Sequence, residues 1–472
     1  MQLSHSPRVV RAVFDDPNLV SSGGLVPVMA LALAESVGLR ELADVRLSVP
    51  TDKGANAGLK VCSLVAGMVA GADSIDDMAL LRHGGMRRVF DHVYAPSTLG
   101  AFLRAFTFGH VRQLDAVASR FVAALAGRAP LVGEAGDGEF VLVDVDDTVI
   151  EVHGYAKQGA GFGYSGVRGL NALLATVTTP HTAPVIVAQR LRKGSVGSPR
   201  GAKRLITDAL KTVRGLAGVS NGRPLVRADS AFYGRGLVLA AVRAGADVSV
   251  TARLDKRVKA AIAGIADDAW TPIEYKDAIY DEQTGRWISR AEVAEIPFTA
   301  FTSRSKAEQV PGRLVVRRIP DLNPGKNQAP GQETLFDMWR FHAFFTTVNV
   351  EVMDTVTADK THRGHAIIEQ VNADLKNSAL AHLPSGVFAA NAAWLVLAVM
   401  AFNLTRAAAT LTGGNLAKAV TATVRRKLVN IAARIASSAR RITLHLPSNW
   451  PWQTPWTRLF AHACGPPATA MP

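Results

Sequence analysis

The stretch that most constrains this fold is an apolar, β-branched run that also carries acidic residues, Phe140-Val-Leu-Val-Asp-Val-Asp-Asp-Thr-Val-Ile150. Its length and its valines predict a central strand. Side chains two residues apart on a strand share a face, so Asp144 and Asp146 point the same way and Asp147 points the opposite way. Carboxylates in such a strand are costly to bury unless they are paired or bound to a metal. The sequence therefore predicts a sheet with a polar site on its central strand.

Strands and helices alternate after this run. The pattern predicts strands at 184–188, 224–230 and 247–251, and helices at 201–217 and 235–244. The stretch before the second strand is interpreted as turn-rich. This alternation is typical of an α/β fold.

Two acidic residues further along the chain lie in patterns that favour a site. Asp229 ends a predicted strand, and open α/β sheets bind ligands at such strand ends. Glu369 belongs to a predicted helix in which five polar side chains fall within an arc of roughly 80°. These side chains are His362, His365, Glu369, Asn372 and Lys376. A solvated helix face would use interchangeable charges rather than histidines, so we interpret the arc as a functional stripe.

The segments on either side of the α/β region differ from it. Residues 1–130 are predicted to be helical, and a glycine turn among clustered arginines suits either a helix-turn-helix-like DNA-binding unit or an ordinary helical bundle. Residues 252–345 carry many prolines and short β-rich runs, which predicts a β-rich insertion. From about 361 to about 442 the chain is predicted to be helical.

The charge of the chain is strongly one-sided. Lys and Arg number 53 against 39 Asp and Glu, which gives a formal net charge of +14. That excess indicates a polyanionic partner, nucleic acid first and an anionic membrane surface second. No Asp or Glu occurs from Leu375 to Pro472, so this segment repels itself unless groups such as phosphates neutralise it. We predict that it contacts DNA or RNA.

Composition excludes several classes of protein. Hydrophobic residues at 48% and charged residues at 19% exclude a wholly disordered or fibrous chain. Cys62 and Cys464 are too few for a disulfide scaffold or a four-cysteine zinc site, and they fit a reducing, cytoplasmic compartment. The apolar run 392–402 is shorter than the ~18 residues that a membrane span needs. A buried helix is predicted there, and no membrane partner is expected.

The three acidic segments together resemble the DDE transposases of bacterial insertion sequences, in particular the insertion-sequence family thirteen-eighty. Asp146-Asp147-Thr148 matches the family's Asp-x-Thr in a strand, and Asp229-Ser230 followed by Phe232-Tyr233 matches its second aspartate segment. The spacing Tyr-x2-Arg-x3-Glu-x6-Lys of related families is kept as His362-x2-His365-x3-Glu369-x6-Lys376, with histidines in place of the tyrosine and the arginine. Residues 159–166 also look like the segment that follows the first aspartate in this family.

The resemblance implies an α/β, RNase H-like catalytic domain in which the three carboxylates converge. A β-rich insertion would lie between the second aspartate and the glutamate, with a helical N-terminal domain and a basic helical C-terminal tail around it. The implied regions are a helical DNA-binding domain at 1–130, the catalytic core at 131–251 and 346–410, the insertion at 252–345, and the basic region at 411–472.

The resemblance also assigns the chemistry. Asp146, Asp229 and Glu369 are the implied catalytic residues and the ligands of two Mg²⁺ ions, for which Mn²⁺ substitutes. Water cleaves DNA at the inverted-repeat ends, and the freed 3′-hydroxyl then attacks target DNA in a cut-and-paste reaction. Residues expected to support the ligands or to contact phosphate are Asp144, Thr148, Arg363, His365 and Lys376. Asp144 becomes the ligand itself if the strand register differs.

The expected partners are double-stranded DNA, as terminal inverted repeats and as target, and a second copy of the chain, because two ends must be synapsed. DNA contacts are predicted for Arg82, Arg87, Arg88, Arg104, Arg425, Arg426, Lys427, Arg434, Arg440 and Arg441.

Four other interpretations compete with this one. The segment Val141–Val149 also resembles the hhhDxDxT loop of haloacid-dehalogenase-type phosphatases, with Asp144 as nucleophile and Asp146 as acid and base. Gly161-Phe-Gly-Tyr-Ser-Gly166 fits the dinucleotide-binding pattern G-x-G-x-x-G, but no convincing helix follows it. A zinc site on the Glu369 helix lacks the metalloprotease order of residues. A catalytically inactive, DNA-binding relative would explain the charge and leave the carboxylates without a role.

Overall fold

The run with buried carboxylates forms the centre of the sheet, as the sequence predicts. Strand β2 (Phe140–Glu151) pairs in antiparallel fashion with β4 (Arg168–Thr178) and in parallel with β6 (Arg223–Ala228). Neighbours on both edges satisfy its backbone groups, so its valines can be buried. This computed structural model describes residues 12–90, 92–219, 221–273, 280–281, 286–287, 291–320, 339–438 and 441–465.

The largest sheet of the described residues is mixed and has the strand order β3-β4-β2-β6-β7-β13-β12-β11-β8, and β5 also pairs with β4. The further strands are β3 (Gly161–Phe162), β5 (Val185–Lys193), β7 (Asp247–Thr251), β8 (Thr271–Ile273), β11 (Ala291–Ala300), β12 (Val310–Pro320) and β13 (Trp339–Thr346). Strands β8, β11, β12 and β13 of the predicted insertion do not form a separate sheet, because β13 pairs with β7 and so continues the central one. A small hairpin is formed by β9 (Tyr280–Asp281) and β10 (Arg286–Trp287).

Strand β4 corrects the prediction of a turn-rich stretch before β5. Its residues Leu170-Asn-Ala-Leu-Leu-Ala175 carry no β-branched side chain, and they favour a helix by intrinsic propensity. The strand is buried from Gly169 to Thr178 between β2 and β5. Pairing on both edges therefore overrides the local preference.

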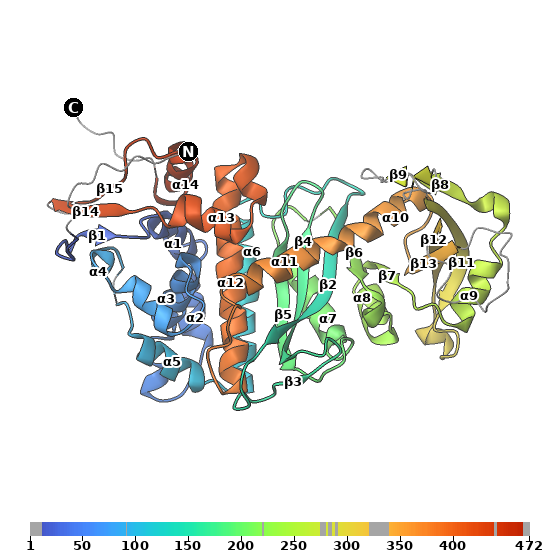
Figure 1. The fold of residues 1–472 in the computed structure, drawn as a ribbon, viewed down its shortest axis with the longest axis horizontal. Helices are drawn as coiled ribbons and strands as arrows, with labels where there is room; N and C mark the ends of the chain where they lie inside the picture. Colours follow the sequence, from blue (N-terminus) through green and yellow to red (C-terminus); the bar gives the residue numbers. More distant parts are fainter. Residues whose placement is uncertain are drawn as a thin grey trace.

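Helices cover the sheet and join it to the N-terminal part of the molecule (Figure 1). Around the sheet lie α7 (Ala202–Val213), α8 (Arg235–Arg243), α9 (Lys256–Ala263), α10 (Thr355–Arg363) and α11 (Ile367–Lys376). A short 3-10 turn, Gly364–Ala366, separates α10 from α11. In Figure 1, α11 crosses in front of the central strands.

Two long helices, α6 (Phe108–Ala126) and α12 (Phe388–Thr412), pack against each other beside β5. By length and composition α12 could cross a membrane, but 89% of its most apolar window is buried inside the protein. Its Asn403 caps the edge of the sheet, accepting from the Ile186 N–H at 2.9 Å and donating to the Ile186 carbonyl at 2.8 Å. The prediction of a buried core helix is confirmed.

The two ends of the described chain meet at one end of the molecule (Figure 1). The N-terminal helices are α1 (Leu25–Leu33), α2 (Leu39–Arg46), α3 (Ala57–Ala70), α4 (Met86–Val89) and α5 (Pro96–Arg104). Strand β1 (Leu19–Val20) pairs with β14 (Ala433–Ser438), which pairs with β15 (Arg441–His445). The C-terminal helices are α13 (Thr421–Val424) and α14 (Gln453–Cys464). The prediction of helix up to about residue 442, and of a helical C-terminal tail, is therefore wrong over this hairpin.

Candidate active site

Strand β2 presents its acidic side chains on two opposite faces. Asp144 and Asp146 face α11 and the 3-10 turn before it, where Asp144 contacts His365 of the turn and Asp146 contacts Asn372 of α11. Asp147 faces the other way, toward β4 and β5, where it contacts Asn171 and Arg192. The two-residue period of a strand thus separates the carboxylates as the sequence predicts.

Asp144 is fully buried and holds a structural ion pair. Arg227, directly across from it on β6, donates from Nε to Oδ1 and from Nη2 to Oδ2, both at 2.7 Å. His365 Nδ1 lies 3.1 Å from Oδ1, and Arg227 Nη1 donates to the carbonyl of Thr361 at 2.5 Å. A buried pair of this geometry is satisfied on both sides. The Asp144–Arg227 pair thus holds the 3-10 turn between α10 and α11 against the sheet.

This arrangement corrects two of the alternatives for Asp144. A phosphatase that used Asp144 as its nucleophile needs that carboxylate in contact with substrate, yet its exposure is 0%. Both carboxylate oxygens also accept from Arg227. In this structure the Asp144 carboxylate contacts Arg227 and His365 rather than open solvent, which disfavours a role as nucleophile or as metal ligand.

Asp146 has a different environment on the same face. It is half-buried, and its Oδ2 accepts a hydrogen bond from Asn372 Nδ2 at 2.8 Å. The pKa of Asp146 is raised to about 6, chiefly by burial; the Asp147 N–H and His365 oppose the rise, and the carboxylates of Asp147 and Asp229 add to it. A carboxylate that is desolvated beside other carboxylates favours a bound cation.

Asp229 directly follows β6, which places it beside β2. Its side chain is exposed and accepts from the N–H of Ala231 at 2.9 Å, so it caps the 3-10 turn Ser230–Phe232. The Asp229 carboxylate is near enough to Asp146 for its charge to raise the pKa of Asp146. The structure therefore brings the first two predicted catalytic residues together from neighbouring strands.

Glu369 lies in the first turn of α11 and is exposed. The residues on either side of it along the helical stripe reach the sheet, since His365 contacts Asp144 and Asn372 contacts Asp146. At about 100° per residue Glu369 shares their face. Nevertheless, among the described residues no group of three or more Asp, Glu, His or Cys side chains is arranged to hold a metal ion.

The donor atoms around Asp146 fit a divalent cation in their chemistry. Asp146, Asp229 and Glu369 offer carboxylate oxygens, the hard ligands that Mg²⁺ and Mn²⁺ take. Asn372 Oδ1, beside Asp146, is buried and has no hydrogen-bond partner within the part of the chain that the structure describes. An oxygen left without a donor next to a desolvated carboxylate suits a cation or its water.

Arg192 holds the opposite face of β2, a feature that the sequence did not reveal. It donates to Asp147 Oδ2 at 2.5 Å and to Asn171 Oδ1 at 2.6 Å. The same guanidinium donates to the carbonyls of Ser198 and Arg200 at 2.7 and 2.6 Å. This network fixes the loop before α7. Arg192 lies four residues beyond the strand predicted at 184–188, so no sequence pattern indicated this role.

His362 of the predicted stripe does not lie in the site. Its ring bridges Ser249 Oγ at 2.8 Å and Thr251 Oγ1 at 2.9 Å, and it stacks on Phe344 with centroids 4.1 Å apart. Burial, with the charges of His365 and Arg227, lowers its pKa to about 3, so the ring stays neutral. Its role is to attach α10 to the sheet.

The remaining predicted site residues divide between two places. Arg363 pairs with Asp359, its Nε lying 2.8 Å from Oδ2. Thr148, two residues along β2 from Asp146, lines a cavity of ≈ 380 Å³ together with Lys376 and Tyr164. Burial lowers the pKa of Lys376, and the charge of Asp146 opposes this.

Most of the predicted DNA-binding arginines lie where the N- and C-terminal segments meet. The exposed ones among the described residues are Arg87, Arg88, Arg104, Arg426, Arg434 and Arg441. Arg88 donates to Ser437 Oγ at 3.2 Å, and Arg434 pairs with Asp16 at 3.1 Å.

The other predicted DNA contacts are less accessible. Arg82, Arg425 and Lys427 are partly buried, Arg425 donates to the carbonyl of Val69, and Lys427 lies 5.0 Å from the Trp452 ring centre. Arg440 lies outside the described residues.

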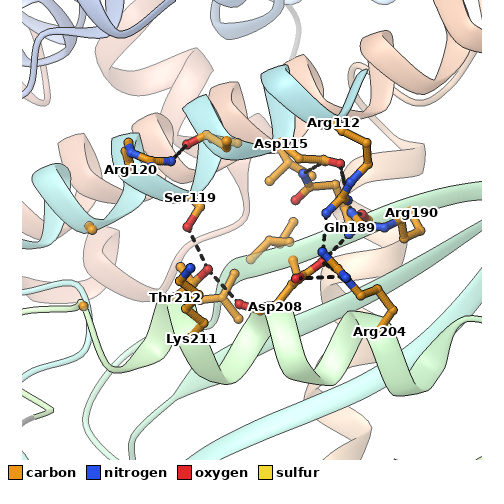
Figure 2. Close-up of a pocket in the computed structure, with 18 residues that line it drawn as sticks. Arg112, Asp115, Ser119, Arg120, Gln189, Arg190, Arg204, Asp208, Lys211 and Thr212 are labelled. Carbon is orange, nitrogen blue, oxygen red and sulfur yellow. Dashed lines mark hydrogen bonds and ion pairs between the residues drawn. The ribbon is translucent and has the colours of Figure 1, made fainter. Parts of the chain in front are cut away.

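A larger cavity, ≈ 460 Å³, lies between α6, β5 and α7 (Figure 2). Arg112 and Arg190 bracket Asp115 at 2.7 and 2.9 Å, and both also pair with Asp208. Its carboxylates are thus neutralised, and none of the predicted catalytic residues lines it. The ion pairs across this cavity connect α6, β5 and α7.

Two comparisons with known proteins bear on the site. A family model described as transposase DDE domain group 1 matches residues 3–463, which is nearly the whole chain. A search of curated proteins finds no match. The match includes every residue of the candidate site, from β2 through α11.

Proposed function

The chain belongs to the family of the transposase DDE domain, group 1, and we propose that it excises an insertion sequence and joins it to target DNA. Membership implies a DNA substrate and a nuclease or transposition activity, and DDE transposases generally use divalent metal ions. The finer proposal is cut-and-paste transposition by an RNase H-like domain in the bacterial cytoplasm. The observation that carries it is the closeness of Asp146, in the middle of β2, to Asp229, which directly follows β6, with the stripe of α11 against the same face.

We assign Asp146, Asp229 and Glu369 as the residues that hold the metal ions. When bound, a divalent cation supplies a Lewis acid and makes water or a 3′-hydroxyl nucleophilic at neutral pH. Asn372 orients the Asp146 carboxylate through its amide. His365 and the Asp144–Arg227 pair hold α11 against β2, which keeps Glu369 and Lys376 near the reacting phosphate. Lys376 offsets the phosphate charge.

Excision in cells tests this proposal, with the open reading frame and its own flanking DNA as donor. Glu369→Gln and Asp229→Asn keep the shape of each side chain and remove its charge, so each should lower excision by at least about a hundredfold. Glu351→Gln, an exposed glutamate outside the stripe, is the matched control and should excise normally. Excision by Glu369→Gln at the wild-type rate would refute the glutamate assignment, and no excision by the wild type would favour an inactive DNA-binding relative.

Purified protein gives a second test, because chelation should abolish cleavage of a duplex that carries the element's end. Added Mg²⁺ or Mn²⁺ should restore it. Cleavage that persists in excess chelator would contradict the metal assignment.

We further propose that two copies of the chain hold the two ends of the element. Light scattering on the complex with excess end duplex should give the mass of two chains and two duplexes. A complex of one chain with two duplexes would overturn the dimer.

A further inference from the structure

The glycines of Gly161-Phe-Gly-Tyr-Ser-Gly166 have a structural purpose that the dinucleotide pattern does not explain. A Cβ on Gly163 would lie 2.5 Å from the Gly194 carbonyl oxygen, and one on Gly194 would lie 2.4 Å from that of Gly161. The two backbones therefore touch, and only glycine allows that approach. The segment leads into β4, so no helix follows that could receive a pyrophosphate.

This contact holds a tight turn at the tip of the loop. The N–H of Gly166 donates to the Gly163 carbonyl at 3.1 Å, and Gly166 has a left-handed backbone with φ 68°. Such a turn needs glycine at its fourth residue to avoid strain. Tyr164 is its second residue and is 70% exposed. The turn therefore holds the exposed Tyr164 ring in a fixed position.

Tyr164 stands beside the candidate catalytic carboxylates. It lines the ≈ 380 Å³ cavity with Thr148, Ser165 and Lys376. Burial raises the pKa of Tyr164, and the charges of Asp147, Asp146 and Asp229 raise it further, which places the ring within their electrostatic reach. No hydrogen bond to its hydroxyl is present among the described residues. Because the side chain is also 70% exposed, both the hydroxyl and the ring are accessible to a ligand.

The charge of the cavity decides what that ligand contacts. Lys376 is its single cation and Glu151 its single anion, so the lining has no net charge. Affinity for a nucleic-acid strand must then come largely from stacking on the ring, a contribution that every base can provide. In a duplex the faces of the bases are covered by their neighbours, and only an unpaired base offers a free face.

We propose that Tyr164 and Lys376 bind an unpaired DNA strand next to the reacting phosphate, with one base stacked on Tyr164 and one phosphate beside Lys376. This site rests on the proposed transposase function, because that function brings a DNA end to Asp146. It makes Tyr164 a positioning residue, which holds the strand and takes no part in proton or metal chemistry.

The test compares binding of two pre-cleaved end duplexes, one blunt and one with a short single-stranded flank at the junction. Wild type should bind the flanked duplex more tightly. Tyr164→Ala should weaken that binding by about five- to 150-fold, the range for one stacked base, and leave binding of the blunt duplex unchanged. Tyr164→Phe should keep the preference, because it keeps the ring. Tyr155→Ala is the matched control, since Tyr155 is 90% exposed on the preceding loop, between β2 and β3, and lies outside the cavity.

A photocrosslink locates the contact independently. A 5-iodouracil base in the flank should crosslink to Tyr164, as read by mass spectrometry. A flank preference that survives Tyr164→Ala, or a crosslink only to other residues, would overturn the stacking site and leave the transposase proposal intact. Wild type that binds neither duplex better than unrelated DNA would overturn both.

Discussion

Asp144 and Asp146 lie two residues apart on one face of β2, yet their environments give them different roles. Asp144 is buried, and Arg227 neutralises it through two hydrogen bonds of 2.7 Å. Asp146 has an amide donor instead of a cation, and its pKa rises to about 6 because of burial. The residue that lacks a protein cation is the one that would hold a metal.

The raised pKa of Asp146 predicts how stability depends on pH. The folded protein binds this proton more tightly than the unfolded chain, whose ordinary value is 3.8. Stability from this group therefore falls as pH rises between about 4 and about 6. In metal-free buffer, Asp146→Asn should melt at a higher temperature than wild type at pH 7.5, and the difference should vanish toward pH 4.

Asp354 supplies a control of opposite sign for the same melting series. Hydrogen bonds from the Thr357 hydroxyl and backbone lower the pKa of Asp354. Its contribution is present above pH 3.8 and is lost as pH falls through the lower folded value, so Asp354→Asn should melt below wild type at pH 7.5. Asp146→Asn that melts below wild type at pH 7.5 would contradict the desolvation argument.

At the scale of elements, the joint between α10 and α11 decides where Glu369 lies. His362 attaches α10 to β7, and the Asp144–Arg227 pair supports the 3-10 turn that follows. Arg227 passes directly under Gly364, where an added Cβ would lie 2.8 Å from Nη1. The Arg227 guanidinium cannot move away, because its Nε donates to Asp144 and its Nη1 donates to the carbonyl of Thr361.

Gly364→Ala should therefore displace the joint, with a loss of about 1–3 kcal/mol of stability and a large drop in DNA cleavage. Gly236→Ala in α8 is the matched control, since the nearest atom to its Cβ is Lys203 Cβ at 3.8 Å. It should be neutral or stabilise by up to about 1 kcal/mol. Chemical unfolding and end cleavage measure both variants, and wild-type behaviour of Gly364→Ala would contradict the close approach.

At the scale of the molecule, the chain begins and ends in one structural unit. β1 pairs with β14, and Arg425 donates to the carbonyl of Val69 at the end of α3. Arg88 contacts β14, the strand that carries Arg434, so both arginines lie at one end of the molecule. The strands of the insertion lie at the other end (Figure 1). This arrangement supports a role of that surface in binding DNA, apart from the candidate catalytic residues on β2 and α11.

Arg425 and Arg426 are adjacent, but the same substitution should affect stability at Arg425 and DNA binding at Arg426. Arg426 is exposed, so Arg426→Gln should leave the melting temperature unchanged, weaken DNA binding and reduce the salt slope by about 0.9. Arg425 is partly buried against α3, so Arg425→Gln should lower the melting temperature. Melting curves and binding at several salt concentrations test the pair. An unchanged salt slope in Arg426→Gln would remove it from the DNA surface.

The sequence by itself determined whatever is written in local periodicity. The alternation of β2 places Asp144 and Asp146 on one face, and the 3.6-residue period places His365, Glu369 and Lys376 on one stripe. Both follow from neighbours along the chain, because strand and helix geometry fix where successive side chains point. The ordered trio of acidic residues likewise indicated a DDE transposase, which the family match over residues 3–463 confirms.

Only the tertiary structure decided which partner each of these groups meets. Asp144 is neutralised because Arg227, 83 residues away, lies directly across from it on β6. β4 is a strand because β2 and β5 pair with it, and β14 is a strand because β15 and the distant β1 do. Pairing over such separations depends on the assembled sheet and its burial, which no window of neighbouring residues contains.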